Sequence, residues 1–238
     1  MPFLTASWLD LALLNYDAPP SLLAPLVPRG TELDTWHGRA LISVVGFYFA
    51  DTRVLGLSIP RHRSFEEVNL RFYVRRDTGS GPVRRGVVFV RELVPRLAIA
   101  VVARALYNEP YLSVPMRHST TLGAAAGGRV EYGWEFRGRS YRLAAEAEGA
   151  AAVPLPGSEA EFITEHYWGY TRQRDGSTLE YEVRHPPWRV WTSRRHEFSG
   201  PAAALYGPAF GEILSRPPAS AFVAEGSPVT VYSGRPVE

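Results

Sequence analysis

The segment 65–75, FEEVNLRFYVR, alternates apolar and polar side chains along most of its length. This period of two is typical of a β-strand, because successive side chains of a strand point to opposite faces of the sheet. The apolar face is formed by Val68, Leu70, Phe72 and Val74. The opposite face carries Glu67, Asn69, Arg71 and Tyr73. The chain must therefore fold so that one strand presents two chemically different faces.

Turn signals between β-type segments predict several antiparallel pairs. The loop 77–82, DTGSGP, would connect the strand 65–75 to a returning strand at 86–93. The turns at 137–139 and 175–176 would close two further hairpins. Further strands are expected over 33–50, 129–136, 140–148, 168–174, 179–183 and 221–232. Strands therefore dominate the predicted structure.

Helical signals are few and short. Helices are expected over 19–30, 96–107, 159–166 and 201–214. The third begins with Ser158 followed by Glu161 three residues later, which is the spacing of a capping box. Many strands, few helices and no long linker predict a single β-rich α+β domain over residues 1–238.

All 26 basic side chains are arginine, and the chain has neither lysine nor cysteine. A guanidinium stays protonated up to a pKa above about 12, so no side-chain amine is available to form an imine. Thiol nucleophiles and cysteine-ligated metals are excluded as well. None of the six histidines has the helical spacing of a metal pair, so we expect no metal and no cofactor. The net charge of +2 gives little reason to expect a nucleic-acid partner.

The N-terminal sequence, MPFLTASWLDLALLNYD, carries no basic leader, and Asp10 interrupts its short apolar stretch. A secretory signal is therefore not expected. No run in the chain approaches the roughly 18 apolar residues of a membrane-spanning helix. We expect a cytoplasmic protein with no membrane partner.

The segment 104–111, RALYNEPY, resembles the REIWGFPK signature of the acetoacetate decarboxylase superfamily. Three of its residues keep their places: Arg104, Tyr107 and Pro110. In that family the residue after the proline is the lysine that forms a Schiff base, and here it is Tyr111. The FEEV phrase at 65–68 resembles the family's aromatic-x-Glu-Val strand, in which the glutamate points into a cavity. Glu67 is the matching position.

Other phrases are similar to the YqjF-like bacterial branch of the superfamily: PRG at 28–30, the alternating polar face of 67–74, TEHY at 164–167 and HPPW at 185–188. The resemblance implies a closed, cone-like antiparallel β-barrel or sheet with a few flanking helices and an internal cavity. It also leaves open a homo-oligomer. It does not imply the decarboxylase mechanism, because the imine requires a lysine that this chain lacks.

The polar face of strand 65–75 is the centre of the candidate site. If its apolar face packs against covering helices, Glu67 and Arg71 must point into the cavity, where they pair with each other or meet a ligand. The alternatives are a solvated strand face and a purely structural ion pair. Glu67 and Tyr111 are the candidate acid and base groups. The candidate ligand-binding residues are Asn69, Arg71, Tyr73, Arg104, His166, His185 and Trp188, with Trp134 as a further apolar wall.

Three functions remain open from the sequence. The first is a protein that binds a small oxygenated or carboxylate-bearing molecule, with Arg71 and Arg104 as its charge partners. The second is a lysine-independent lyase, isomerase or hydratase, in which Glu67 removes a proton and Tyr111 or Arg104 steadies the developing oxyanion. The third is a scaffold whose cavity is filled by side chains.

Overall fold

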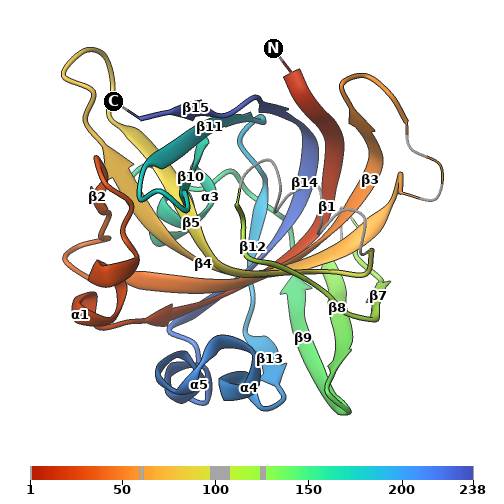
Figure 1. The fold of residues 1–238 in the computed structure, drawn as a ribbon. Helices are drawn as coiled ribbons and strands as arrows, with labels where there is room; N and C mark the ends of the chain where they lie inside the picture. The colour runs from red at the N-terminus through yellow and green to blue at the C-terminus, as the bar shows by residue number, and fades with distance from the viewer. Residues whose placement is uncertain (1, 59, 61, 97–107, 124–126, 238) are drawn as a thin grey trace.

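The computed structural model describes residues 2–58, 60, 62–96, 108–123 and 127–237. Two sheets account for most of these residues (Figure 1). The larger sheet contains β1 (Pro2–Asp17), β2 (Glu32–Leu33), β3 (Leu41–Val54), β4 (Phe65–Arg76), β5 (Arg84–Val94), β6 (Tyr111–Ser113), β10 (Trp168–Arg172), β11 (Thr178–Arg184), β12 (Val190–Thr192), β14 (Ser220–Tyr232) and β15 (Arg235–Pro236). The smaller sheet contains β7 (Met116–Thr120), β8 (Gly127–Phe136), β9 (Arg139–Glu148) and β13 (Arg195–Ser199). The expectation of a β-rich fold is confirmed.

The larger sheet is ordered β12-β14-β1-β3-β4-β5-β10-β11-β15, with β2 added to β4 and β6 to β5. β11 also pairs with β14, at Val183 with Val231 and Arg184 with Thr230, so the pairings from β14 to β11 form a ring that leaves β12 and β15 outside it. Most neighbours are antiparallel, but β5 pairs in parallel with both β6 and β10. The expectation of a closed, cone-like barrel stays a prediction.

The smaller sheet and two short helices cover one face of the larger sheet. The helices are α4 (Ala202–Tyr206) and α5 (Pro208–Leu214), which lie together beside β9 and β13 (Figure 1). The apolar residues of β4, namely Val68, Leu70, Phe72 and Val74, belong to the same buried cluster as Tyr132 and Leu143 of the smaller sheet. The apolar face of β4 therefore packs mainly against a second sheet, where the sequence suggested helices.

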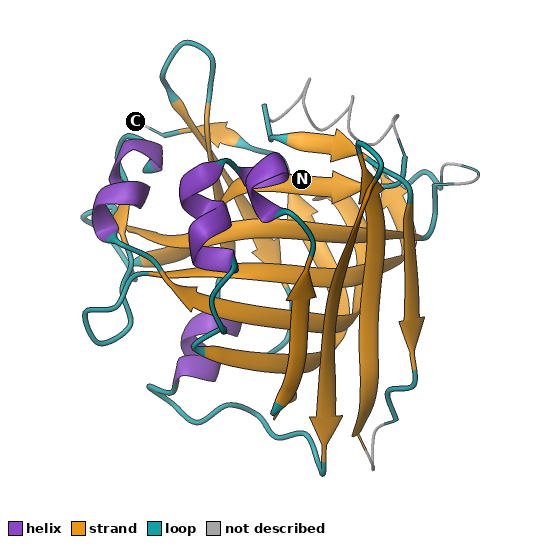
Figure 2. Cartoon of the chain, turned by 90° about the horizontal axis from the view of Figure 1, so that it is seen from below, coloured by secondary structure: helices purple, strands orange, loops and turns teal. Residues whose placement is uncertain are grey.

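Three of the four predicted helical segments contain helices in the structure, and one of these segments is divided in two. The segment 19–30 contains α1 (Pro20–Leu23) and a 3-10 turn, η1 (Ala24–Leu26), and α3 (Glu159–Thr164) begins at a Ser158 hydroxyl that accepts from the Glu161 amide. The expected helix 201–214 is divided into α4 and α5 at Gly207, whose φ is 87°. Of the helix expected over 96–107, all but Arg96 lies outside the described residues. The helices are short, and strands make up most of the molecule (Figure 2).

The long N-terminal strand β1, which the sequence did not predict, lies between β3 and β14 and contributes Trp8 to the interior. Its path depends on one glycine of β14. Gly226 has a φ of 80°, and a Cβ there would lie 1.9 Å from the carbonyl oxygen of Trp8. Only glycine tolerates both the left-handed conformation and this close approach.

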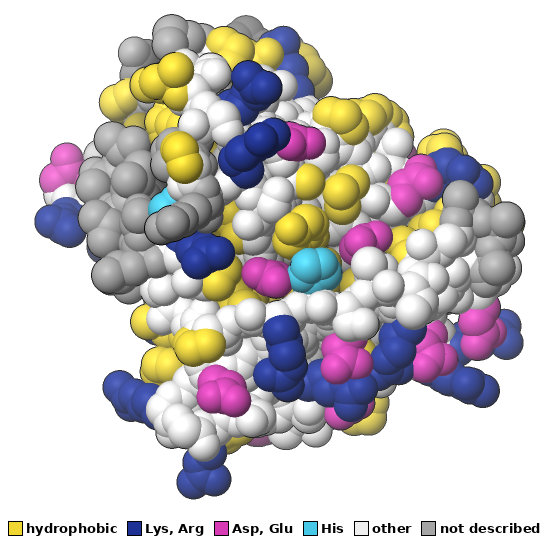
Figure 3. Space-filling model, turned by 90° about the vertical axis from the view of Figure 1, so that its right-hand side faces the viewer, with side chains coloured by type: hydrophobic (Ala, Val, Ile, Leu, Met, Phe, Trp, Pro, Cys, Tyr) yellow, Lys and Arg dark blue, Asp and Glu magenta, His cyan; other side chains and the backbone are white. Residues whose placement is uncertain are grey.

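The outer surface carries paired charges. On the smaller sheet, Glu131 accepts from Arg129 and Arg142, while Arg129 also pairs with Glu146. Side chains of both signs are interspersed on the face shown in Figure 3. None of the helices in the described part of the chain has the length and apolar character needed to cross a membrane.

Candidate functional site

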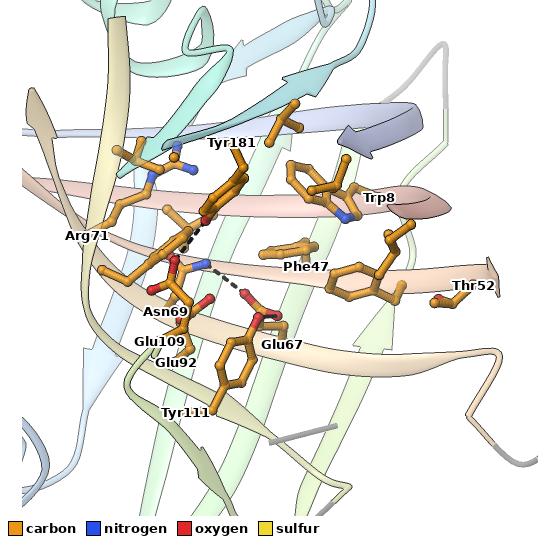
Figure 4. Close-up of a pocket in the computed structure, with 18 of the residues that line it drawn as sticks. Trp8, Phe47, Thr52, Glu67, Asn69, Arg71, Glu92, Glu109, Tyr111 and Tyr181 are labelled. Carbon is orange, nitrogen blue, oxygen red and sulfur yellow. Dashed lines mark hydrogen bonds between the residues drawn. The ribbon is translucent and has the colours of Figure 1, made fainter. Parts of the chain in front are cut away.

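A cavity of about 370 Å³ lies on the face of the larger sheet opposite the smaller one. The structure gives it two chemically different ends (Figure 4). The polar end is formed by Glu67, Asn69, Arg71, Glu92, Glu109, Tyr111 and Tyr181. The aromatic end is formed by Trp8, Phe47, Phe49, Phe65 and Trp188. The packed-scaffold hypothesis predicts a filled interior, which this cavity does not match.

The alternation of β4 directs three polar side chains into this cavity. Glu67, Asn69 and Arg71 all line it. Asn69 is paired in register with Val45 of β3 on one side and with Glu92 of β5 on the other. Residues at i, i+2 and i+4 of a strand share a face, so the placement follows directly from the sequence pattern.

A bulge in β5 brings one more acidic group to the same face. Leu70 pairs with Arg91, but the next residue, Arg71, pairs with Phe89, so one β5 residue is extra. Without the bulge, Phe89 and Glu92 would point to opposite faces, since they are three residues apart. With it, both line the cavity.

Three glutamates meet at the polar end, each at most 5% exposed. Glu67 accepts hydrogen bonds from the Asn69 amide at 3.0 Å and from the Tyr111 hydroxyl at 3.3 Å. Glu109 accepts from the hydroxyls of Tyr181, at 3.0 Å, and of Thr171. Glu92 lies beside them on β5 (Figure 4). Tyr111 therefore shares its chamber with Glu67, as the resemblance implied.

Burial makes these carboxyl groups hard to ionise. It raises the pKa of Glu67 to about 7, against the hydrogen bonds from Asn69 and Tyr111, and likewise raises the pKa of Glu109 to about 7. Burial and the neighbouring Glu109 and Glu67 raise the pKa of Glu92 well above its ordinary value. Burial, followed by the charge of Glu67, also raises the pKa of Tyr111. Near neutral pH Glu67 and Glu109 therefore exchange protons readily, which suits acid and base chemistry.

Arg71 is buried at the same end and makes no direct ion pair with a described carboxylate. Its side chain donates to the Ile163 carbonyl at 3.3 Å and lies over the Tyr73 ring, but its Nε has no hydrogen-bond partner within the described part of the chain. Nor does it form an ion pair with any described carboxylate. A buried guanidinium without a counter-ion is costly, so this group is available for an anionic ligand.

Tyr73 and His166 support the wall next to Arg71. His166 lines the cavity, and burial, followed by the charges of Arg85 and Arg71, lowers its pKa well below the ordinary value. It is therefore neutral at pH 7. Its ring lies 4.6 Å from that of Tyr73, whose hydroxyl is hydrogen-bonded to Ser43 at 2.5 Å. Tyr73 lies behind the wall and does not line the cavity.

Trp188 and His185 lie at the aromatic end. Trp188 lines the cavity and donates its indole N–H to Ser227 at 2.8 Å. His185 stacks on Trp188, with ring centroids 4.3 Å apart, and also contacts Tyr167. It is therefore one layer removed from the cavity and holds the indole in place.

Two other candidates, Trp134 and Arg104, are not among the described residues that line the cavity. Trp134 stacks on Tyr141 in the core between the two sheets, so its expected role as a cavity wall is wrong. It sits on a strand of the smaller sheet, which lies on the other side of β4. Arg104 lies outside the described residues.

Sequence reasoning missed Glu92, Glu109, Tyr181 and Trp8. Glu109 stands two residues before Tyr111 and could have been found from that spacing, since side chains at i and i+2 share a face in extended chain. Glu92 could not, because the bulge breaks the alternation of β5. The described residues contain no group of three or more histidines and acidic side chains arranged to hold a metal ion.

Comparison with known proteins gives a family and a fold. Residues 5–228 match the model of DUF2071, a family described as an uncharacterised conserved protein. The uncharacterised protein YqjF of Bacillus subtilis is 30% identical over 188 residues, which cover 76% of this chain and 72% of YqjF.

Two solved structures share the fold at low sequence identity. The enduracididine biosynthesis enzyme MppR, solved in complex with pyruvate, superposes with a TM-score of 0.68 at 13% identity, covering 100% of this chain and 91% of MppR. The acetoacetate decarboxylase of Legionella pneumophila gives a TM-score of 0.66 at 13% identity, covering 99% of this chain and 87% of the enzyme. The resemblance inferred from sequence motifs is confirmed.

Proposed function

We propose that this chain, which belongs to the DUF2071 family and has an acetoacetate decarboxylase-like fold, binds a small oxygenated or carboxylate-bearing molecule in its internal cavity. A single domain, residues 1–238, would form the whole binding site. The ring of strand pairings from β14 to β11 would close as a cone-like barrel around the ligand.

The observation that carries this proposal is the buried Arg71 without a described carboxylate partner. The residue is 8% exposed and lines the cavity. Arginine binds a carboxylate through two parallel hydrogen bonds, and desolvation strengthens that interaction. A ligand carboxylate would supply both the missing charge and an acceptor for the unpartnered Nε.

The remainder of the ligand would lie toward the aromatic end. The rings of Trp8, Phe47 and Phe49 contact one another there, with centroids 5.1 to 5.8 Å apart. Burying apolar ligand surface against such rings contributes roughly 25 cal/mol per Å². The cavity volume is within the range typical of small-molecule sites.

The structural relatives support the choice of ligand class. MppR was solved with pyruvate, a small keto acid, in complex. This chain lacks the lysine with which the superfamily forms an imine, so its ligand would be held by hydrogen bonds and charge alone. We place the protein in the cytoplasm, with no nucleic-acid partner, and expect it to form a homo-oligomer.

Binding of carboxylates to the Arg71→Met variant tests the proposal. A panel of small keto acids and carboxylic acids is titrated calorimetrically, and the best binder is compared between proteins. We expect Arg71→Met to lose roughly tenfold or more in affinity. Arg75→Met is the matched control, since Arg75 lies on the same strand but is exposed and paired with Glu32. Equal affinities in the wild type and Arg71→Met would reject the proposal.

A second function, proton transfer, is favoured by the contact between Glu67 and Tyr111. A carboxyl group with a pKa of about 7 that accepts from a phenol at 3.3 Å can remove a proton next to a carbonyl while the phenol steadies the enolate oxygen. Exchange of the α-protons of bound keto acids in D₂O, followed by NMR, measures this activity. Exchange that is lost in Glu67→Gln supports catalysis. If the wild-type protein exchanges the α-protons of none of the keto acids that it binds, it binds ligands without catalysing proton transfer.

A further inference from the structure

Two buried oxygens at the polar end have no donor, and the glutamate oxygen among them accepts a hydrogen bond once its carboxyl group is ionised. Asn69 Oδ1 and Glu92 Oε2 are both buried and lack a hydrogen-bond partner among the described residues. Asn69 and Glu92 face each other in the register of β4 and β5. Directly opposed residues have Cβ atoms about 5 Å apart. The two free acceptors therefore lie side by side on the cavity wall.

The orientation of the Asn69 amide follows from its neighbour. Its Nδ2 donates to the carboxylate of Glu67 at 3.0 Å. When Glu67 is ionised, as we expect beside a bound ammonium, turning the amide over would place Oδ1 against a carboxylate and lose the hydrogen bond. The free atom of Asn69 is therefore the oxygen, and a ligand that meets it must bring a donor.

The balance of charge at the polar end points in the same direction. Three glutamates line it, whereas Arg71 is the only arginine among the described residues of the cavity wall. An ammonium group offers three N–H donors and a positive charge, but a hydroxyl offers one donor and no charge. A buried carboxylate gains most from a donor that is itself charged. An ammonium therefore fits the free acceptors better than a hydroxyl does.

We infer that the ligand is an amino acid with an apolar side chain, its carboxylate on Arg71, its ammonium between Asn69 Oδ1 and Glu92 Oε2, and its side chain toward the aromatic end. This inference rests on the proposed function and adds the ammonium to it. Arg71 and Asn69 are two residues apart on one face of β4, so their Cα atoms are roughly 7 Å apart. The long arginine side chain can bridge that spacing to a carboxylate and an ammonium on the same carbon atom.

Proton linkage gives an independent signature. In the empty cavity the glutamates hold protons near neutral pH, because burial opposes their ionisation. An ammonium placed beside them would favour their ionised forms and displace protons. Binding of an amino acid should therefore release protons, whereas binding of the matching acid without the amine should not. Titrations in two buffers of different ionisation enthalpy measure the protons exchanged.

Three probes that differ only in their head group test the inference: L-phenylalanine, 3-phenylpropanoate and 2-phenylethylamine. Affinities for the intact protein are measured by calorimetry, with tryptophan fluorescence as a second readout since Trp8 and Trp188 line the cavity. We expect phenylalanine to bind at least roughly ten times more tightly than either of the other two compounds, because only phenylalanine engages both Arg71 and the free acceptors.

The Glu92→Gln variant separates the ammonium from the carboxylate. It keeps the shape of residue 92 and removes its charge, so the affinity for phenylalanine should fall roughly tenfold while that for 3-phenylpropanoate stays unchanged or rises. Glu66→Gln is the matched control. Glu66 lies on β4 but pairs with His118 away from the cavity, so both affinities should stay as in the wild type. Thermal unfolding shows that each variant is folded.

The possible outcomes separate the two proposals. If 3-phenylpropanoate binds as tightly as phenylalanine, the ammonium inference is overturned and the proposed function stands. If only 2-phenylethylamine binds, both the zwitterion and the role of Arg71 are overturned. Failure of all three probes overturns the inference, and the carboxylate panel then decides the proposed function separately.

Discussion

Glutamates are buried in two regions of this molecule, with opposite surroundings. Glu180 on β11 is 1% exposed and is surrounded by three arginines, with Arg84 at 2.6 Å, Arg235 at 2.9 Å and Arg76 at 3.0 Å. At the polar end of the cavity, Glu67, Glu92 and Glu109 are almost equally buried and form no ion pair with a described arginine. The four side chains are almost equally inaccessible to solvent, but their partners differ.

The difference appears in the direction of the pKa shifts. Burial alone would raise the pKa of Glu180, but hydrogen bonds from Arg235, Arg76 and Arg84 hold it below its ordinary value. For Glu67 and Glu109 burial prevails, and the pKa rises to about 7. The cluster around Glu180 is internally complete and fastens the C-terminal strand β15 to the sheet. The cavity cluster has no arginine partner of this kind among the described residues.

Glu180→Gln should give the largest effect on stability. The substitution leaves three arginines close together without their common carboxylate, and removing one partner of a buried ion pair is strongly destabilising. Two of the arginines are partly exposed to solvent, so we expect a loss of about 3 kcal/mol in the free energy of unfolding. Urea denaturation followed by circular dichroism measures it. A loss below about 1 kcal/mol would mean that the cluster is not structural.

The two regions should respond to pH in opposite directions. Glu67 and Glu109 bind protons more tightly in the folded than in the unfolded chain, so their contribution to stability is lost as pH rises from about 4.5 to about 7. The loss should amount to several kcal/mol, because one pKa unit corresponds to about 1.4 kcal/mol for each group. Glu180, with its lowered pKa, contributes stability that is lost as pH falls below about 4.5.

Urea denaturation between pH 4 and pH 8 measures the free energy of unfolding over both ranges, the loss at high pH and the loss at low pH. The double variant Glu67→Gln with Glu109→Gln serves as the control, and it should flatten the loss at high pH while the loss at low pH remains. A wild-type stability that rises steadily up to pH 8 would contradict the assigned shifts.

Glu92→Gln applies the same substitution to the cavity cluster and should have the opposite sign to Glu180→Gln. It removes a carboxyl group whose ionisation is opposed by burial, Glu109 and Glu67, and replaces it with a neutral group of the same shape. We expect the free energy of unfolding at pH 8 to rise by about 1 kcal/mol. If Glu92→Gln destabilises the protein as much as Glu180→Gln, the two regions are energetically alike and the comparison fails.

Thr171→Val should give the smallest change. Its hydroxyl donates to Glu109, and the substitution keeps the side-chain shape while removing that donor. We expect a loss of about 1 kcal/mol or less in stability. The pKa of Glu109 should rise further, because the hydrogen bond from Thr171 lowers it. An NMR titration that follows the carboxyl ¹³C shifts would detect this rise. Thr178→Val is the control, because the Thr178 hydroxyl donates to the Arg29 carbonyl and not to Glu109.

Local patterns predicted much of the fold. The alternation of 65–75 gave β4 and the three inward residues of its polar face, and the turn signals gave the hairpins β8 with β9 and β10 with β11. Those signals depend on neighbours in sequence, which is why they could be read. The strand β1 was missed, because side chains buried on both faces leave little alternation to detect.

The sequence alone determined that no amine or thiol chemistry is available to any side chain and that Glu67, Asn69 and Arg71 share one face of a strand. It also showed that Tyr111 stands where the acetoacetate decarboxylase signature, which this segment resembles, has its lysine. Only the tertiary structure decided which buried charges find partners. Glu180 meets arginines from β4, β5 and β15, whereas Glu67, Glu92 and Glu109 meet one another across β4, β5 and the segment before β6. Electrostatic energy depends on distances between atoms far apart in the chain, and sheet pairing and a single bulge set those distances.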